Sequence, residues 1–436
     1  MTKTTRKHGQ KHHAMHLAHA DQAKNTNNAM GKSDKRKPNS MPAPQTSPDI
    51  VIFGAGIAGL WSFNRLKSLG YDVLLLEMDT IGCGQTIASQ GIIHSGLKFS
   101  LAGKVNKLAK SISAMPDLWR EALDGDKNSK VGVNLSSAKV AATSQQLLIP
   151  SGFMGGLTKL VTQRALGNNV HDVLQEDWSE DIKDSGFKGS VVFMDEPVLD
   201  IPSVLRALAQ PYKECIKKIS TEQAQSPFKF LKDNNITTKQ IIFTSAANNH
   251  DIAHSHSHNK GLETQKRPLL QGMIKNAPFP LFAHLVGTSD KPVASITTHK
   301  TSDGSLVWYL GGAVAERKKE NDPTDVYNAA IKAFKTYLPN IDFSQIEWDV
   351  LPIDRIEGKS KTDSWMPDTP TIHHTDEALY CWPTKLTFAP MLSDMILTDL
   401  QNKNITPSNT SSDFSFLEDA DYTQTPWDKA KWKKPL

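Results

Sequence analysis

The sequence predicts an α/β fold organised as two domains (α+β): a Rossmann-like domain and a second, discontinuous domain built on an antiparallel sheet. Two observations carry this prediction. A strand, a glycine turn, a helix and a second strand follow one another from Ile50 to Glu77, and this βαβ order requires a parallel sheet. The stretch "VASITTHKTSDGSLVWYLGG", residues 293–312, alternates apolar and polar residues around Asp303-Gly304, which indicates an antiparallel hairpin.

The composition is that of a globular protein. With 436 residues, 38% hydrophobic and 22% charged, the chain can form about two or three domains. The net charge of +4 includes +7 from residues 1–48, where seven Lys and two Arg meet two Asp, so the remainder carries −3. This balance does not favour binding to nucleic acid.

Cysteine usage and hydropathy indicate the compartment. Cys83, Cys215 and Cys381 lie far apart without a C-x-x-C spacing, so we expect neither disulfides nor a zinc site. No apolar run approaches the roughly 18 residues of a membrane-spanning helix, and the N-terminus lacks the apolar core of a signal peptide. We therefore expect a cytoplasmic protein with, at most, peripheral membrane contact.

The N-terminal elements follow from local patterns. Residues 1–48 are rich in Lys, His, Asn, Gln and Ser, and we expect this basic tail to be disordered because it has too little apolar surface to fold. Strands are predicted at 50–53 and 73–77, helices at 57–69 and 202–208, and a buried strand in "KQIIFTSAAN".

The segment 248–266 has no apolar periodicity and indicates a surface loop. His254, His256 and His258 alternate there with serines, but no carboxylate or cysteine at ligand spacing completes a site, so we expect no metal. Beyond residue 402 the chain is polar again, and the tryptophans at its end are expected to anchor it to the body.

The glycine turn after the first strand is suited to a pyrophosphate. Gly54 permits the tight turn, Gly56 lets a phosphate approach the backbone, and Gly59 lets the helix pack on the sheet. The N–H groups of Ile57 and Ala58 at the helix N-terminus can bind an anion. Glu77 stands 18 residues after Gly59, where a carboxylate binds ribose hydroxyls and repels a 2′-phosphate. NAD and FAD both fit this unit, whereas NADP does not.

The next segment, "GCGQTIASQGIIHSGLKFS" from Gly82 to Ser100, resembles the flavin-contacting loop of the D-amino-acid oxidase superfamily. This family of FAD-dependent oxidoreductases includes glycine and sarcosine oxidases, L-2-hydroxyglutarate dehydrogenase and glycerol-3-phosphate dehydrogenase. The resemblance implies a Rossmann-like FAD-binding domain. The residues that carry it, and that it implies contact FAD, are Gln85, Thr86, Ser89, Gln90 and Gly91, followed by His94.

Two later segments are similar to the same family. In "IIFTSAANNHDI" Ala246 and Ala247 stand where relatives usually read Ala-Gly-Ala, and "WPTKLTFAPMLSDMIL" is similar to the last βα turn, where Thr384, Lys385 and Leu386 would lie beside the flavin. Some relatives attach FAD through a histidine in the flavin loop. Ala88 aligns with that position, so the resemblance implies noncovalent FAD.

Oxidation of an acid by a flavin also needs a clamp for the carboxylate and, for some substrates, a base. Arg355 in "PIDRIEG" is our first candidate for the clamp, because a planar guanidinium matches a carboxylate, and Arg267 and Arg317 are weaker candidates. His299 is a candidate base, with His284 as an alternative. His94 and Lys385 are further catalytic candidates.

The sequence therefore predicts an FAD-dependent oxidoreductase that acts on a small 2-amino or 2-hydroxy acid by hydride transfer from Cα to the flavin. The expected partners are a small carboxylate substrate and an electron acceptor, which can be oxygen, a quinone or a carrier protein. Two alternatives stay open: a glycerol-3-phosphate-type FAD dehydrogenase, and a non-catalytic FAD-binding or sensor protein.

We expect the two domains to be interleaved along the chain. The predicted FAD-binding domain takes residues 49–130, 195–260 and 350–403, the substrate domain takes 131–194 and 261–349, and the tails are 1–48 and 404–436.

Overall fold

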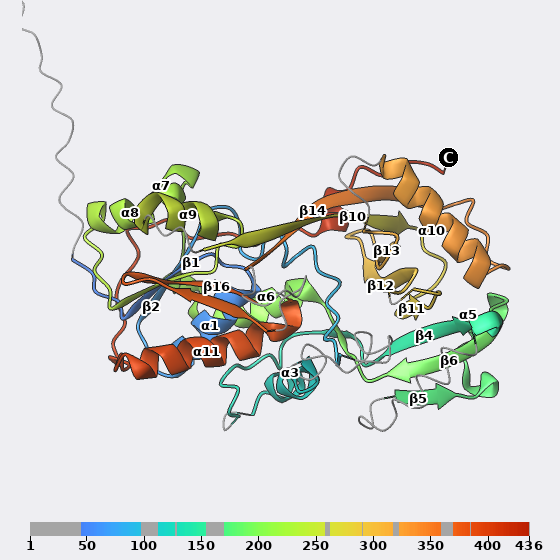
Figure 1. Ribbon diagram of the computed structural model, residues 1–436, viewed down its shortest axis with the longest axis horizontal. Coiled ribbons are helices and arrows are strands. Elements are labelled where there is room, and N and C mark those ends of the chain that lie inside the picture. The colour runs from blue at the N-terminus through green and yellow to red at the C-terminus, as the bar shows by residue number, and fades with distance from the viewer. Residues whose placement is uncertain are drawn as a thin grey trace, which may run out of the picture. The chain divides into compact units, whose positions relative to one another are not determined.

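The computed structural model describes residues 45–96, 112–126, 129–153, 170–257, 262–289, 291–316, 322–358, 369–383 and 385–435. Its first sheet has six strands in the order β15-β16-β9-β1-β2-β8 (Figure 1). These strands are β1 (Ile50–Phe53), β2 (Val73–Glu77), β8 (Ile216–Lys218), β9 (Gln240–Phe243), β15 (Thr371–His374) and β16 (Ala378–Trp382). All neighbouring pairs are parallel except β15 with β16.

The βαβ unit predicted from the sequence is confirmed. β1 and β2 are buried at every residue, as a strand covered on both faces requires, and α1 (Ile57–Ser68) connects them. Gly70, with φ +88°, follows the helix in the left-handed conformation that ends it.

Helices cover both faces of this sheet (Figure 1). On one face α1 packs against α6 (Ile201–Ala209) and α11 (Ala389–Asn402). On the other lie α7 (Thr221–Gln225), α8 (Pro227–Asp233) and α9 (Asn248–Ser257). The carboxyl ends of β1, β2, β9 and β16 share one edge, which is where ligands bind in such sheets.

The second sheet has eight strands in the order β14-β10-β13-β12-β11-β4-β6-β5. They are β4 (Gln145–Pro150), β5 (Val170–Val173), β6 (Gly189–Met194), β10 (Thr264–Lys275), β11 (Ala283–Leu285), β12 (Ala294–Lys300), β13 (Leu306–Gly311) and β14 (Glu347–Gly358). Only β4 and β11 are parallel neighbours. The predicted hairpin is β12 and β13, paired from Ser295 with Gly311 to Lys300 with Leu306.

The helix α10 (Pro323–Tyr337) packs on β10 and β14, and an aromatic core lies beneath it, with Phe334 and Trp308 rings 5.1 Å apart. β14 stays paired with β10 as far as Gly358. The chain therefore leaves the second sheet after residue 358, beyond the boundary at 350 that the sequence suggested, because twelve consecutive pairs hold these two strands together.

The prediction of a loop at 248–266 is wrong at both ends, since residues 248–257 form α9 and β10 begins at Thr264. Asn249, Ile252 and Ala253 are buried on one side of this helix, and the Asn249 amide donates to the carbonyls of Phe243 and Cys381. A polar residue thus takes the place that an apolar one usually has in the helical pattern. His258 lies outside the described residues.

The smaller elements are α3 (Met115–Asp124), a two-stranded ladder of β3 (Val140–Ala142) and β7 (Val198–Leu199), α5 (Glu180–Asp184) and α12 (Pro426–Lys429). The C-terminal segment is anchored as expected, with Trp427 buried against Tyr309 and Trp432 packed on the same cluster. No helix in the described part of the chain has the length and hydropathy to cross a membrane.

Candidate functional site

The glycine turn after β1 leaves no room for side chains. Gly54 has φ +104°, and a Cβ there would lie 2.9 Å from the Thr244 carbonyl carbon. A Cβ on Gly59 would lie 1.9 Å from the Gly54 oxygen, so this glycine sets the approach of α1 to β1. The Thr86 hydroxyl accepts the Ile57 N–H at 2.9 Å and fixes the flavin loop to the helix N-terminus.

Glu77 ends β2 beside this turn. Its carboxylate accepts the N–H of Ala55 at 2.7 Å and that of Asp79 at 2.9 Å, and its side chain is almost fully buried. Burial raises the pKa of Glu77, an effect that these hydrogen bonds oppose. A buried carboxylate at the carboxyl end of the second strand is the arrangement that binds a ribose.

A cavity of about 990 Å³ opens at this edge and extends along one face of β10 and β14. It gathers most of the side chains that the sequence singled out. Those lining it are Gly54, Gly56, Ile57, Ala58, Glu77, Gln85, Thr86, Ser89, Gln90, Gly91, His94, Ala246, Arg355, Lys385 and Leu386. Thr384 and Arg317 lie outside the described residues. Gly59 stands behind the lining, where it packs the helix.

The loop between β2 and α3 forms one wall of the cavity and is bonded to the second sheet. The Gln85 side-chain oxygen accepts the Ile356 N–H at 3.1 Å, and the Gln90 amide donates to the carbonyls of Ser295 and Tyr309, each at 2.9 Å. The Ser89 hydroxyl is buried at the cavity and has no hydrogen-bond partner among the described residues. Since a buried hydroxyl needs a partner, this atom fits a polar ligand such as a flavin edge.

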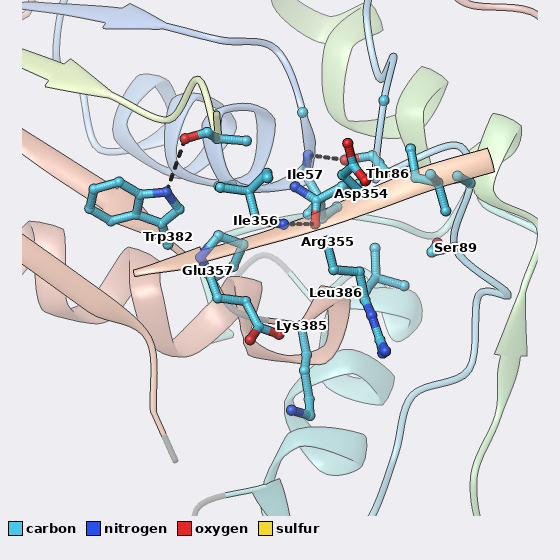
Figure 2. A pocket seen from close by; sticks show the side chains of 18 of the residues that line it. Ile57, Thr86, Ser89, Asp354, Arg355, Ile356, Glu357, Trp382, Lys385 and Leu386 are labelled. Carbon is cyan, nitrogen blue, oxygen red and sulfur yellow. Dashed lines mark hydrogen bonds between the residues drawn. The ribbon is translucent and has the colours of Figure 1, made fainter. Parts of the chain in front are cut away.

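The turn after β9 adopts a strained conformation. Ala246 has φ +48°, which favours glycine, and its carbonyl accepts the Trp382 indole N–H at 3.1 Å (Figure 2). Trp382 is fully buried. The indole therefore joins the two turns that flank the cofactor end of the cavity.

Charged groups also line the cavity. Arg355 and Glu357 extend from the same side of β14, and Lys385 points the same way (Figure 2). Glu357 is fully buried and is paired with Arg267, whose Nε lies 3.1 Å from its Oε2. Arg355 has only a 3.5 Å contact, to Glu316, and its buried Nε has no partner in the described part of the chain.

Burial and the nearby Arg267 charge lower the pKa of Arg355, while the carboxylates of Glu316 and Glu357 act in the opposite direction. The Arg355 guanidinium is therefore less well compensated than the Arg267 guanidinium. An anion bound in the cavity would supply what Arg355 lacks.

His94 also lines the cavity and is held by Glu196, a residue that the sequence reasoning did not single out. Glu196 is fully buried directly after β6, and its Oε2 lies 3.0 Å from His94 Nδ1. Its Oε1 accepts both the N–H and the hydroxyl of Ser95 at 2.8 Å. Glu196 could have been singled out in the sequence because it is an acidic residue inside the apolar run "VVFMDEPVL".

The structure does not bring His299 to this site. Its ring stacks on Trp427 with centroids 4.1 Å apart, its Nε2 lies 3.0 Å from the Thr297 hydroxyl, and it does not line the cavity. Burial lowers the pKa of His299 to about 3. His284 is buried nearer the site, with its ring centroid 6.4 Å from that of His94. The pairing register of the hairpin places His299 beneath the C-terminal segment, and the ring therefore lies outside the cavity.

A parallel sheet with a glycine turn and a terminal acid, joined through one cavity to a mostly antiparallel sheet, defines a two-domain dinucleotide-binding protein. The family described as DAO, FAD dependent oxidoreductase, matches residues 49–223. Over 372 residues the chain is 33% identical to the probable FAD-dependent oxidoreductase PA4991 of Pseudomonas aeruginosa, covering 83% of this chain and 93% of that protein. The chain belongs to this family of FAD-dependent oxidoreductases, and its cofactor is FAD.

Solved structures agree with the fold. The crystal structure of PA4991 matches with a TM-score of 0.72 at 28% identity, covering 89% of this chain and 99% of that one. Glycine oxidase from Geobacillus kaustophilus has a TM-score of 0.56, and L-alpha-glycerophosphate oxidase from Mycoplasma pneumoniae, with FAD bound, has 0.55. Both are 14% identical over 82% of this chain and 95% of theirs, and they share the fold alone.

Proposed function

We propose that the protein oxidises a small 2-amino or 2-hydroxy acid whose carboxylate binds Arg355. The observation that carries the proposal is Arg355 in the cavity wall, since its Nε has no hydrogen-bond partner among the described residues. A carboxylate can accept two parallel N–H bonds from this guanidinium, which fixes the orientation of the acid. Lys385 lines the same cavity and adds positive charge.

FAD, when bound, supplies a two-electron acceptor for the Cα–H of the acid. The residues that would hold it are the glycine turn, Glu77, and the loop from Gln85 to Gly91. Ala88 lines the cavity where a covalently attached relative would carry histidine, which supports noncovalent binding. The chain's own contribution is to orient the acid, exclude water and accept a proton.

The charge pattern favours a carboxylate over the phosphate of glycerol 3-phosphate. Among the described residues, Lys266 is paired with Asp354 at 2.7 Å, Arg267 with Glu357 and Lys291 with Glu316. Because each of these cations is already paired with a carboxylate, the cavity has less uncompensated positive charge than a phosphate dianion requires. Each negative charge of the phosphate would need hydrogen-bond donors of its own.

The test is anaerobic flavin reduction. The holoprotein is mixed with pooled 2-hydroxy and 2-amino acids, and bleaching of the flavin bands is expected. In Arg355→Lys the substrate concentration for half-maximal reduction rate should rise by about 10- to 100-fold, because the bidentate bond is lost. Arg206→Lys, an exposed position on α6, is the matched control and should match the wild type. An unchanged half-saturation in Arg355→Lys would refute the clamp.

A further inference from the structure

The pair His94 and Glu196 is more than a structural contact of the flavin loop. Both oxygens of the Glu196 carboxylate face donors: Ser95 supplies its N–H and hydroxyl to Oε1, and His94 Nδ1 lies at Oε2. Glu196 is 0% exposed, and a buried carboxylate stays ionised only when donors surround it in this way. The arrangement therefore favours a charged Glu196 that accepts the Nδ1 proton of His94.

This contact selects one tautomer of His94. If Nδ1 carries the proton and donates it to Glu196, the lone pair of the neutral ring lies on Nε2. The ring is held further by its own backbone N–H, which donates to the Thr387 hydroxyl at 3.3 Å. The carboxylate also stabilises the imidazolium that forms when Nε2 takes a proton. A histidine prepared in this way on a cavity wall is a general base.

We propose that Glu196 is a positioning residue that prepares His94 as the general base of the reaction, and that the site is built for a 2-hydroxy acid rather than a 2-amino acid. This inference rests on the proposed function above. An amine can be oxidised from its neutral form without a base, whereas a hydroxyl must give up its proton as the carbonyl forms. The substrate loses its hydroxyl proton to His94 Nε2 and its Cα–H, with the bonding pair, to the cofactor, and becomes a 2-oxo acid.

The surroundings of His94 are compatible with this role. Among the described residues, the titratable groups near it include Glu196, two residues after β6, and His284 on β11, while Lys385 before α11 lines the same cavity. His284 Nδ1 is engaged with the Ser295 hydroxyl at 2.7 Å. Glu196 contacts the His94 ring directly, with its Oε2 3.0 Å from Nδ1, so its charge acts on the ring at short range.

The decisive variant is Glu196→Gln, because the hydrogen bonds dictate how the new amide must turn. The Ser95 backbone N–H can only donate, so the amide oxygen must stay on Ser95 and the amide NH₂ must face His94 Nδ1. Nδ1 then accepts, the ring proton moves to Nε2, and the lone pair in the cavity is lost. Ser95→Ala is the matched control, because it weakens the same contact but keeps the N–H and leaves Nδ1 untouched.

Two measurements on the holoprotein test the proposal. The first is the ¹⁵N NMR signal of the His94 side chain, assigned by its loss in His94→Gln: the wild type and Ser95→Ala should show the Nδ1–H tautomer, and Glu196→Gln the Nε2–H tautomer. An Nε2–H tautomer in the wild type would overturn the proposal without reference to turnover. The same reading stays valid if Glu196→Gln does not fold, because the wild type alone decides it.

The second measurement is anaerobic flavin reduction between pH 5 and 9 with matched acids, lactate against alanine and 2-hydroxyglutarate against glutamate. The hydroxy acid of a pair should reduce the flavin faster. His94→Gln should slow flavin reduction by the hydroxy acid by about 100-fold or more. Glu196→Gln should slow it by about 10- to 100-fold. In Glu196→Gln the rising limb of the pH profile should also move to lower pH, because the imidazolium loses the carboxylate that stabilises it. Glu180→Gln, at an exposed acid on α5, is the control for activity and should keep the wild-type profile.

The outcomes separate the two proposals. Faster reduction by the amino acid of each pair, or an unchanged pH profile in Glu196→Gln, would overturn this inference and leave the proposed function standing. Reduction by none of the acids would refute the proposed function, and the substrate assignment with it, while the tautomer measurement would still decide the role of Glu196.

Discussion

The carboxylate of Glu77 should control FAD affinity, and Glu77→Gln tests this directly. In the structure its two oxygens already accept the N–H groups of Ala55 and Asp79, at 2.7 and 2.9 Å. Oε2 has a second lone pair that can accept a ribose hydroxyl, whereas Oε1 also lies 3.7 Å from the Cys83 thiol. An amide in this place offers one acceptor and one donor, and its NH₂ must face one of the two N–H groups. The variant therefore loses charge and part of its hydrogen bonding to the ribose.

The size of the effect follows from the bonds lost. A hydrogen bond to a charged group contributes about 1.5–3 kcal/mol, so loss of one such bond should weaken FAD binding by about 10- to 100-fold. The pH dependence has a definite sign. Because burial raises the pKa of Glu77, the wild-type carboxylate is protonated, and FAD affinity falls, as the pH is lowered toward that raised pKa. Glu77→Gln should bind FAD weakly at every pH and lack this dependence.

The assay is titration of the apoprotein with FAD, followed by quenching of flavin fluorescence between pH 5 and 8. Glu180→Gln, an exposed acid on α5, is the control and should bind FAD as the wild type does. An unchanged dissociation constant in Glu77→Gln, with the fold intact by circular dichroism, would show that this carboxylate does not bind the ribose.

Three further variants test individual contacts. His299→Ala should reduce its flavin at the wild-type rate, because the ring lies outside the cavity. Burial lowers the pKa of His299 to about 3, whereas in the unfolded chain this histidine binds a proton near pH 6.5. Its contribution to the free energy of unfolding is therefore full above pH 6.5 and falls by about 1.4 kcal/mol for each pH unit below that. Denaturant unfolding of His299→Ala should lack this fall. Ala246→Gly should raise the free energy of unfolding by about 0.5–1 kcal/mol by relieving the positive φ, whereas Ala247→Gly, where φ is not positive, should lower it. Gly59→Ala should prevent recovery of flavin-containing protein, because the new Cβ would meet the Gly54 oxygen at 1.9 Å, and a normal yield of holoprotein would contradict this packing.

The sequence predicted the elements whose formation depends on residues close together in the chain. The bounds of β1, β2 and the hairpin follow from apolar periodicity and turn residues, and the glycine turn follows from steric limits that act within a few residues. The helix at 248–257 was missed because Asn249, a buried polar residue, donates to carbonyls of the preceding strand β9 and of the distant strand β16. No periodicity of apolar residues records such a contact.

The same distinction explains the site. Residues on the flavin loop could be found because they share one segment, whereas Glu196 reaches His94 from a position 102 residues further along the chain. His299 failed as a candidate for the opposite reason. Its place in the hairpin could be predicted, but the face it presents depends on pairing with strands far away in sequence and on the C-terminal segment that covers it.

The flavin loop is also held in place by distant parts of the chain, and this has a consequence for cofactor binding. Gln85 and Gln90 bond to β14, β12 and β13, and the Tyr309 hydroxyl lies 2.9 Å from the Ala88 carbonyl. Each such bond contributes about 1 kcal/mol, so the loop is ordered by the second sheet without help from the flavin. The entropy of ordering it is therefore lost on folding rather than on binding. Removal of the Gln90 amide should then lower FAD affinity although its atoms are engaged elsewhere, because the cofactor would have to order the loop itself.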